Sequence, residues 1–250
     1  VDGKSEVAGE QVAGAAGQQA KRGVGLHQSG RHRANRPVAA EGADERRALV
    51  DGLDLVVGAG ECVTLMGPSG CGKSTLLAYV AGSIGPPFAA AGRVLVGGDD
   101  VTAWPPERRR IGILFQDDLL FPHLSVGGNL AFALHERVRG RLERRARIDA
   151  ALAEADLAGF ADRDPATLSG GERARVALMR TLLAEPRALL VDEPFNKLDA
   201  QLRDGVRRFV FDHALERAIP ILLVTHDEAD ARAAGGRVLR FGDGGTLRDR

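Results

Sequence analysis

The stretch from Gly67 to Thr75 has the residue types and spacing of a phosphate-binding loop. Its glycines let the backbone curl until successive N–H groups point inward and form a nest for an anion. Lys73 adds a mobile positive charge suited to the β- and γ-phosphates of a nucleotide, and the Ser74 hydroxyl is placed to ligate Mg²⁺. The expected phosphate-binding residues are Gly67, Pro68, Ser69, Gly70, Cys71, Gly72, Lys73, Ser74 and Thr75.

The elements on either side of this loop have the order that the pattern G-x-x-x-x-G-K-[ST] requires. An apolar, strand-like run covers 61–66, and a helix-like run begins at Leu76. The positive end of that helix would face the bound phosphate. The alternative is a glycine turn that happens to precede a helix and binds nothing.

Polar residues that could complete such a site end three further apolar runs. Asp192 and Glu193 follow the run 188–191, which favours a metal or water ligand followed by a general base. His226 follows the run 221–225 and could contact a terminal phosphate, while Gln116 ends the run 111–115. The alternative is that these are ordinary polar residues at exposed strand ends.

The segment Ser169–Glu172 opens a helix and has two interpretations. Ser169 and Glu172 form a capping box, which by itself explains these residue types. Gly170 and Gly171 would also leave N–H groups at the helix start open to an anion. From the residues alone, the capping box is favoured. A later helix is predicted to be capped near Asn196.

The segment from Ser125 to about Gly159 is predicted to be helical, with Ile148 and Leu152 on the apolar side of its second helix. The loop Leu119–Leu124 before it is unusually apolar. It is either part of the core or a docking surface for a partner.

Composition sets outer limits on the function. With 250 residues, 44% hydrophobic and 27% charged, the chain has the balance of a soluble protein with one large or two small domains. Its formal net charge of zero gives no sign of a nucleic-acid-binding surface. We expect a cytoplasmic protein, because no apolar run approaches the ~18 residues of a membrane span and no signal peptide is recognisable. Cys62 and Cys71 lack metal or redox spacing and are expected to be small fillers.

Residues 1–46 show neither helical nor strand periodicity and contain no aromatic residue. Such a composition cannot bury enough apolar surface to offset its ordering entropy, so we expect a low-complexity, disordered extension or a misassigned start. The ordered domain is predicted to cover 47–250. It should begin with an alternating strand at 48–57 and close with a short edge strand at 237–241.

Taken together and in this order, the motifs resemble those of the ATP-binding-cassette (ABC) ATPases. Residues 67–75 match the Walker A motif, Gln116 the Q-loop, 168–178 the signature motif, 188–195 Walker B, 196–199 the D-loop and 225–226 the switch histidine. The resemblance covers roughly 48–242 and is closest to the Ynj-type importer ATPases and to bacterial importers of the thiamine, sulfate, iron and polyamine group. It implies an α/β fold: a P-loop NTPase core with a mixed sheet, an antiparallel β-subdomain and an all-helical signature subdomain at about 117–184.

The resemblance also implies a mechanism. Two copies would bind two ATP molecules head to tail, each phosphate loop facing the signature of the other copy. An integral membrane permease would dock near 116–124 and receive its solute from a periplasmic or lipid-anchored binding protein, with the ATPase peripheral on the inner membrane face. No nucleic acid would take part. The implied residues are Ser74, Gln116 and Asp192 for Mg²⁺; Glu193, His226 and Gln116 for catalysis; and Ser169, Gly170 and Gly171 for ATP across the dimer.

Two rival interpretations stand beside this one: an ABC ATPase of an export or lipoprotein-release system, and an ATP-binding protein that does not hydrolyse. The sequence also departs from the family pattern. Glu172 replaces the commoner Gln, and the aromatic residue that normally stacks on adenine is missing near Asp44. Either Arg46 or Arg47 stacks on the base instead, through its planar guanidinium, or both are solvated loop residues.

Overall fold

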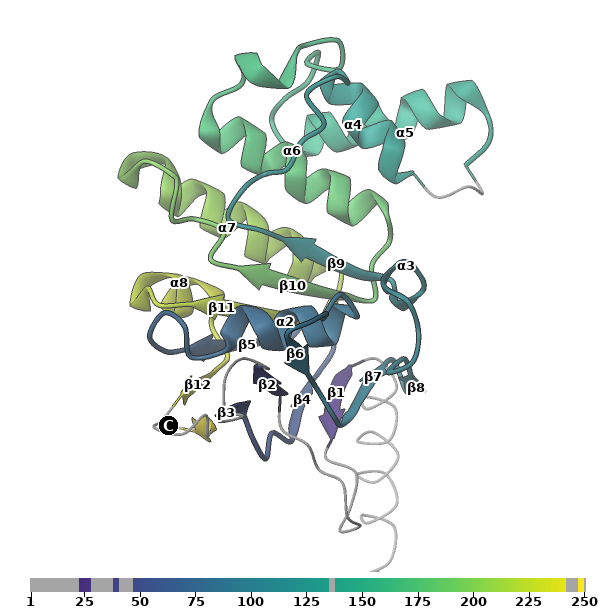
Figure 1. Cartoon of the computed structure of the whole chain (residues 1–250). Coiled ribbons are helices and arrows are strands. Elements are labelled where there is room, and N and C mark those ends of the chain that lie inside the picture. Colours follow the sequence, from purple (N-terminus) through teal and green to yellow (C-terminus); the bar gives the residue numbers. More distant parts are fainter. Residues whose placement is uncertain (1–22, 28–37, 41–46, 135–137, 242–246, 250) are drawn as a thin grey trace, which may run out of the picture.

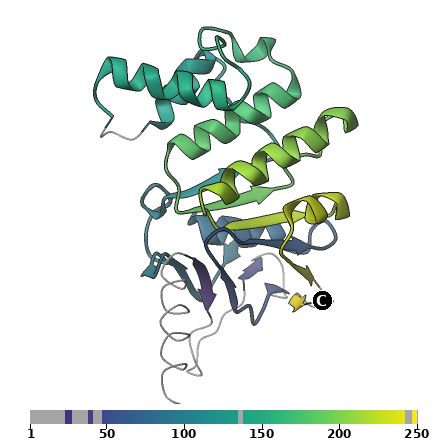
Figure 2. The same ribbon diagram turned by 180° about the vertical axis from the view of Figure 1, so that it is seen from behind.

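The computed structural model of the chain describes residues 23–27, 38–40, 47–134, 138–241 and 247–249. A central sheet lies between a small β region and a helical region (Figure 1). Seen from behind, helix α7 (Ala200–Glu216) crosses the back of that sheet (Figure 2).

The central sheet has six strands among the described residues. Three adjacent inner strands position the motifs: β5 (Cys62–Met66), β11 (Ile221–Thr225) and β10 (Ala188–Asp192). Each of these three is a continuous apolar run buried almost along its whole length, which is typical of parallel strands covered on both faces. Neighbours from β12 to β9 are parallel, so the strand ends before the Gly67 loop, at Asp192 and at Thr225 meet at one edge. The order is β13 (Leu247–Asp249), β12 (Arg237–Phe241), β5 (Cys62–Met66), β11 (Ile221–Thr225), β10 (Ala188–Asp192) and β9 (Ile111–Leu114).

Two hydrophobic cores lie on the two faces of this sheet, because successive residues of a strand point to opposite sides. Leu189 and Val191 of β10 belong to the core that contains α7. Leu190 belongs to the other core, with α2 (Lys73–Ala81). Cys62 is 3% exposed, and burial raises the pKa of its thiol to about 12, which fits a filler rather than a reactive group.

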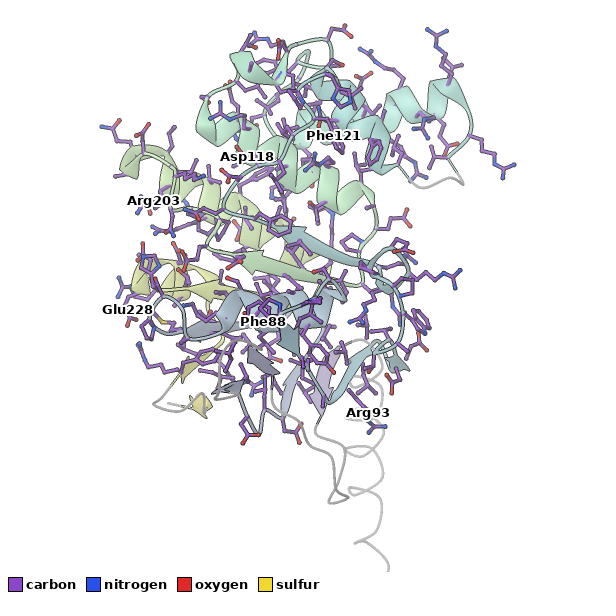
Figure 3. The ribbon with its side chains drawn as sticks, in the orientation of Figure 1. Phe88, Arg93, Asp118, Phe121, Arg203 and Glu228 are labelled. Carbon is purple, nitrogen blue, oxygen red and sulfur yellow. The ribbon has the colours of Figure 1, made fainter. Side chains whose placement is uncertain are left out.

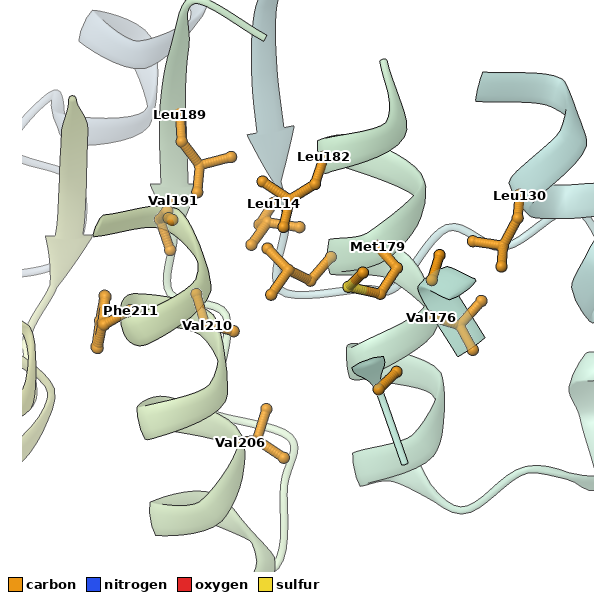
Figure 4. Packing of buried hydrophobic residues seen from close by; sticks show 14 of the residues in the cluster. Leu114, Leu130, Val176, Met179, Leu182, Leu189, Val191, Val206, Val210 and Phe211 are labelled. Atoms are coloured by element: carbon orange, nitrogen blue, oxygen red, sulfur yellow. The ribbon is translucent and has the colours of Figure 1, made fainter. Parts of the chain in front are cut away.

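The helical region continues the first core away from the sheet. Figure 4 shows Met179 of α6 (Gly170–Leu183) packed between strand residues such as Leu114 and Leu130 of α4 (Val126–Ala133). The expected helical subdomain is therefore present, with α5 (Arg141–Glu154) as its third long helix. Three shorter elements are α3 (Pro106–Arg109), the 3-10 helix η2 (Pro165–Thr167) and α8 (Glu228–Ala234). Among the described helices, none combines the length and apolar character that a membrane crossing requires.

Two small antiparallel sheets complete the fold. One has the order β4 (Leu55–Val57), β1 (Val24–His27), β7 (Arg93–Val96) and β8 (Asp99–Asp100). The other has the order β3 (Arg47–Val50), β2 (Val38–Ala40) and β6 (Phe88–Ala89). Together they form the antiparallel β region that the resemblance implies.

The expectation of an unstructured segment up to residue 46 is wrong for β1 and β2. Val24 and Leu26 of β1 are 4% and 5% exposed, and β1 lies between β4 and β7. Burying a Val or Leu side chain stabilises the folded state by about 1.5–3 kcal/mol. Two such side chains help to offset the entropy cost of ordering this short strand. Periodicity could not reveal β1, because a strand of four residues with one internal glycine is too short to show a pattern.

Two strand assignments also need correction. Residues 48–57 form two strands in different sheets, because the chain turns at Gly52 with φ 70°, a left-handed conformation that glycine adopts without strain. The strand at 237–241 is not an edge strand: β5 flanks it on one side and β13 on the other. The three residues of β13 carry too little apolar pattern to be recognised in a glycine-rich tail.

Candidate active site

The loop from Gly67 to Gly72 connects β5 to α2 and has the curled backbone that its glycines predict. Gly70 and Gly72 have φ of 78° and 102°, and α2 begins directly after Gly72. At Gly72 a side chain would also meet the Cβ of Leu49 at 3.0 Å, so both backbone angle and space favour glycine. The start of α2, with its free N–H groups, therefore faces the loop.

Lys73 folds back onto this loop. Its Nζ donates hydrogen bonds to the carbonyl oxygens of Gly67 and Pro68, both at 2.8 Å, and the side chain is 5% exposed. The ammonium group has three donors. It is therefore held at the loop by neutral acceptors that an incoming phosphate could replace.

Ser74 and Asp192 meet across the two elements that carry them. Ser74 Oγ donates a hydrogen bond of 3.2 Å to Asp192 Oδ1. Burial raises the pKa of the Asp192 carboxyl and the charge of Glu193 adds to the rise, while the bond from Ser74 and the charge of Lys73 lower it. A cation beside this carboxylate would favour its charged form.

The oxygen donors at this point fit Mg²⁺, which usually takes one or two protein carboxylates and completes its shell with phosphate and water oxygens. Ser74, Gln116 and Asp192 all line the same cleft. No cluster of three or more His, Cys, Asp or Glu side chains suited to a metal occurs in the described part of the chain. The donors suit an ion that arrives with a phosphate ligand.

Glu193 has a constrained position at the end of β10. Its φ is 47°, and its N–H donates to the carbonyl of Val224 at 2.9 Å. Asn196 Nδ2 donates to Glu193 Oε2 at 2.7 Å, and His226 Nδ1 lies 3.3 Å from Oε1. The structure thus brings the side chains of Glu193 and His226 into contact. The predicted helix cap near Asn196 is wrong: α7 begins after Asp199, and Asn196 holds the carboxylate instead.

A single cleft of about 450 Å³ collects most of the predicted residues. Gln116, Asp192 and Glu193 face the phosphate loop across it. Its lining is Leu49, Ser69, Gly70, Gly72, Lys73, Ser74, Thr75, Phe88, Gln116, Asp192 and Glu193.

The signature residues lie elsewhere. Ser169 and Glu172 form the predicted capping box: Glu172 N donates to Ser169 Oγ at 3.3 Å, and Ser169 N donates to Glu172 Oε2 at 2.7 Å. Gly170 lines a second groove, which adjoins the phosphate cleft at Gln116, and it does not line that cleft itself. Within one chain the two motifs therefore do not share a site.

Asn129 organises the apolar loop Leu119–Leu124, a role that the sequence did not reveal. It is fully buried; its Oδ1 accepts from Phe121 N at 2.8 Å and its Nδ2 donates to Phe121 O at 3.1 Å. Phe121 is half-buried, with its ring 4.8 Å from that of Phe132, which is 71% exposed. The loop is thus fixed in the fold but leaves apolar surface outside. An amide on the buried side of a predicted helix was the available signal.

Arg207 joins α7 to the segment around His226 and was also missed. Its guanidinium donates to Asp230 Oδ1 at 2.5 Å and to Asp227 Oδ2 at 2.8 Å. Thr225 Oγ1 in turn donates to Asp230 at 2.8 Å. An arginine among the apolar positions of α7 pointed to such a buried ion pair.

Arg46 and the side chain of Arg47 lie outside the described residues, so their predicted stacking on a base stays a prediction.

Comparison with known proteins decides the family. The sequence profile described as ABC transporter matches residues 50–196. The chain belongs to the ABC transporter family. It is 48% identical over 185 residues to the uncharacterized ABC transporter ATP-binding protein YnjD of Escherichia coli (strain K12), which covers 74% of this chain and 85% of that protein.

Other members of the family carry names of importers. The Fe(3+) ions import ATP-binding protein FbpC of Mannheimia succiniciproducens is 42% identical over 80% of this chain and 56% of its own length. The spermidine/putrescine import ATP-binding protein PotA of Frankia alni is 46% identical over 76% of this chain and 40% of its own. The chain thus spans about half the length of these importer relatives.

A solved structure shares the fold. The ATP-binding cassette MJ0796, in a dimeric post-hydrolysis state bound to ADP and Pi, aligns with a TM-score of 0.73 and 30% identity, covering 91% of this chain and 97% of that one. The predicted P-loop NTPase fold with mixed sheet is confirmed.

Proposed function

We propose that this member of the ABC transporter family is the ATP-binding and hydrolysing subunit of a bacterial importer. The observation that carries the proposal is the cleft at the carboxyl ends of the central strands. The cleft brings together the N–H groups of the phosphate loop, the ammonium group of Lys73, oxygen donors for a metal and the carboxylate of Glu193.

Each group has a distinct task toward ATP. The N–H groups at the start of α2 bind the phosphates, and Lys73 exchanges its bonds to Gly67 and Pro68 for bonds to phosphate oxygens. Ser74 and Asp192, with Gln116, would hold Mg²⁺. When bound, this ion neutralises charge that develops on the phosphate oxygens.

Glu193 acts as the general base for the attacking water. Asn196 fixes one carboxylate oxygen, which leaves the other oriented toward His226. Through its contact with Glu193, His226 would reach the γ-phosphate, and the pair would then respond to whether that phosphate is present. Because Asn196 and His226 already orient the Glu193 carboxylate, its side chain loses little conformational entropy when it contacts the attacking water.

The separation of the signature from the cleft supports a head-to-tail dimer. Ser169, Gly170 and Gly171 stand at the start of a long helix whose N–H groups suit an anion. They line no part of their own chain's phosphate cleft. A second copy would supply them, as the dimeric state of the MJ0796 cassette also supports.

The importer assignment rests on the names of FbpC and PotA and on the exposed loop near Gln116. An integral membrane permease would contact the apolar surface formed by Leu119, Phe121 and Phe132, placing the chain on the inner membrane face. The solute would reach the permease through a binding protein and would not touch this chain.

Phe121→Ser tests the coupling to the permease. We expect ATP hydrolysis by the isolated chain to stay unchanged and stimulation by its membrane permease partner to be lost, because the ring is half outside the core. Trp104→Ser, at another exposed aromatic (39% exposed), is the matched control and should keep the stimulation. Full stimulation in Phe121→Ser, or a large fall in its melting temperature, would contradict a docking role.

A further inference from the structure

The cleft of the phosphate loop has an apolar part as well as a polar one. Lys73, Ser74, Asp192 and Glu193 provide charge and hydrogen bonds, whereas Leu49 and Phe88 provide apolar surface. Phosphates and a metal account for the polar part. A triphosphate needs no leucine and no aromatic ring, so the apolar part points to a second chemical group on the ligand.

Phe88 reaches the cleft through the small sheet of β3, β2 and β6. The chain leaves α2, passes Pro86 and Pro87, and forms β6, in which Phe88 pairs with Ala40 of β2. Strand β2 pairs with β3, which carries Leu49. These three strands therefore bring Phe88 and Leu49 to the cleft from one sheet. Figure 3 labels Phe88 in front of α2, the helix that begins the phosphate site.

The ring of Phe88 is accessible to a ligand. The residue is 36% exposed, although aromatic side chains usually bury most of their area. Among the described residues that line the cleft, Phe88 is the only aromatic one. Residues 1–66 of the sequence contain no Phe, Trp or Tyr that could take this role.

We propose that Phe88 stacks on the base of the bound nucleotide and is the main aromatic contact to it. The inference rests on the proposed ATP-binding function and specifies its ligand as a nucleoside triphosphate with a planar purine base. A phenyl ring has no donor or acceptor for the edge of a base. Stacking of this kind therefore strengthens ATP and GTP binding alike.

Phe88→Ala tests the role in binding. ATP affinity should fall about 5- to 150-fold, the range for loss of one aromatic–base stack, and GTP affinity should fall by a similar factor. Affinity for tripolyphosphate, which has no base, should stay within about twofold. Trp104→Ala, of similar exposure but outside the cleft, is the control and should change none of the three.

Phe88→Trp in a Trp104→Phe background gives an independent readout, since Trp104 is the only tryptophan of the chain. Tryptophan emission should be quenched by ATP and unaffected by tripolyphosphate. Unchanged ATP affinity in Phe88→Ala, or equal losses for ATP and tripolyphosphate, would overturn the stacking role. If the Arg46→Ala/Arg47→Ala double variant lost ATP affinity while Phe88→Ala kept it, those arginines would hold the base. A parent chain that bound neither ATP nor tripolyphosphate would instead overturn the proposed function itself.

Discussion

Glu193→Gln is expected to bind ATP as the parent does and to release phosphate about 10²–10⁴-fold more slowly, the usual contribution of a positioned general base. The amide has the shape of the carboxylate but cannot accept the proton of the attacking water. Asn196 and His226 lie close enough to contact the amide as well, so the geometry should change little. ATP would then remain bound without turnover and hold two copies together.

The measurement is phosphate release together with the mass of the ATP-bound species by light scattering. Glu185→Gln is the matched control, because Glu185 is a surface carboxylate paired with Arg110 and Arg147 away from the cleft. Hydrolysis by Glu193→Gln at the parental rate would show that another group activates the water.

Arg207→Ala is expected to lower the free energy of unfolding by about 3–5 kcal/mol, the range for breaking a buried ion pair by removing one partner. Asp230 is fully buried, and Arg207 is 5% exposed. Without the guanidinium, Asp230 keeps only its bond from Thr225, while Asp227 also loses a partner. Chemical denaturation gives the value. Arg208→Ala, the exposed neighbour on α7, should change it by less than about 0.5 kcal/mol.

The loss of unfolding free energy in Arg207→Ala should depend on pH. Burial raises the pKa of the Asp230 carboxyl, and the bonds from Thr225 and Arg207 lower it. In Arg207→Ala the folded-state pKa would rise further above the unfolded value of about 3.9. A protonated Asp230 needs no cation, so the loss of unfolding free energy in Arg207→Ala should be small at low pH. This loss should grow as pH rises from the folded-state pKa of Asp230 in the parent to its higher value in the variant. A deficit that is equal at pH 5 and pH 8, or no deficit at all, would contradict the assigned role of the pair.

The strands that carry the motifs could be predicted because each is buried on both faces and so appears as an unbroken apolar run. The capping box at Ser169 could be predicted because both of its partners lie within one turn. The same locality explains the phosphate loop, whose glycines, Lys73 and Ser74 are consecutive. All of these features depend on neighbours in sequence.

The features that were missed depend on partners far away in the chain. Strand β1 gains its stability from β4 and β7, and β12 is an inner strand only because β13 pairs with it. Asn196 looks like a helix cap in sequence, but the fold turns it toward Glu193. Phe88 lies after an ordinary turn and reaches the cleft only because β6 pairs with β2. Local pattern carries no information on such pairings.

Phosphate release from ATP by the full chain, alone and with its membrane permease partner, tests the central claim most directly. The cleft around Lys73, Ser74, Asp192 and Glu193 predicts saturable release that needs Mg²⁺, stops with EDTA and collapses in Glu193→Gln. Release that persists undiminished in Glu193→Gln, or no release above the blank with either preparation, would contradict the account.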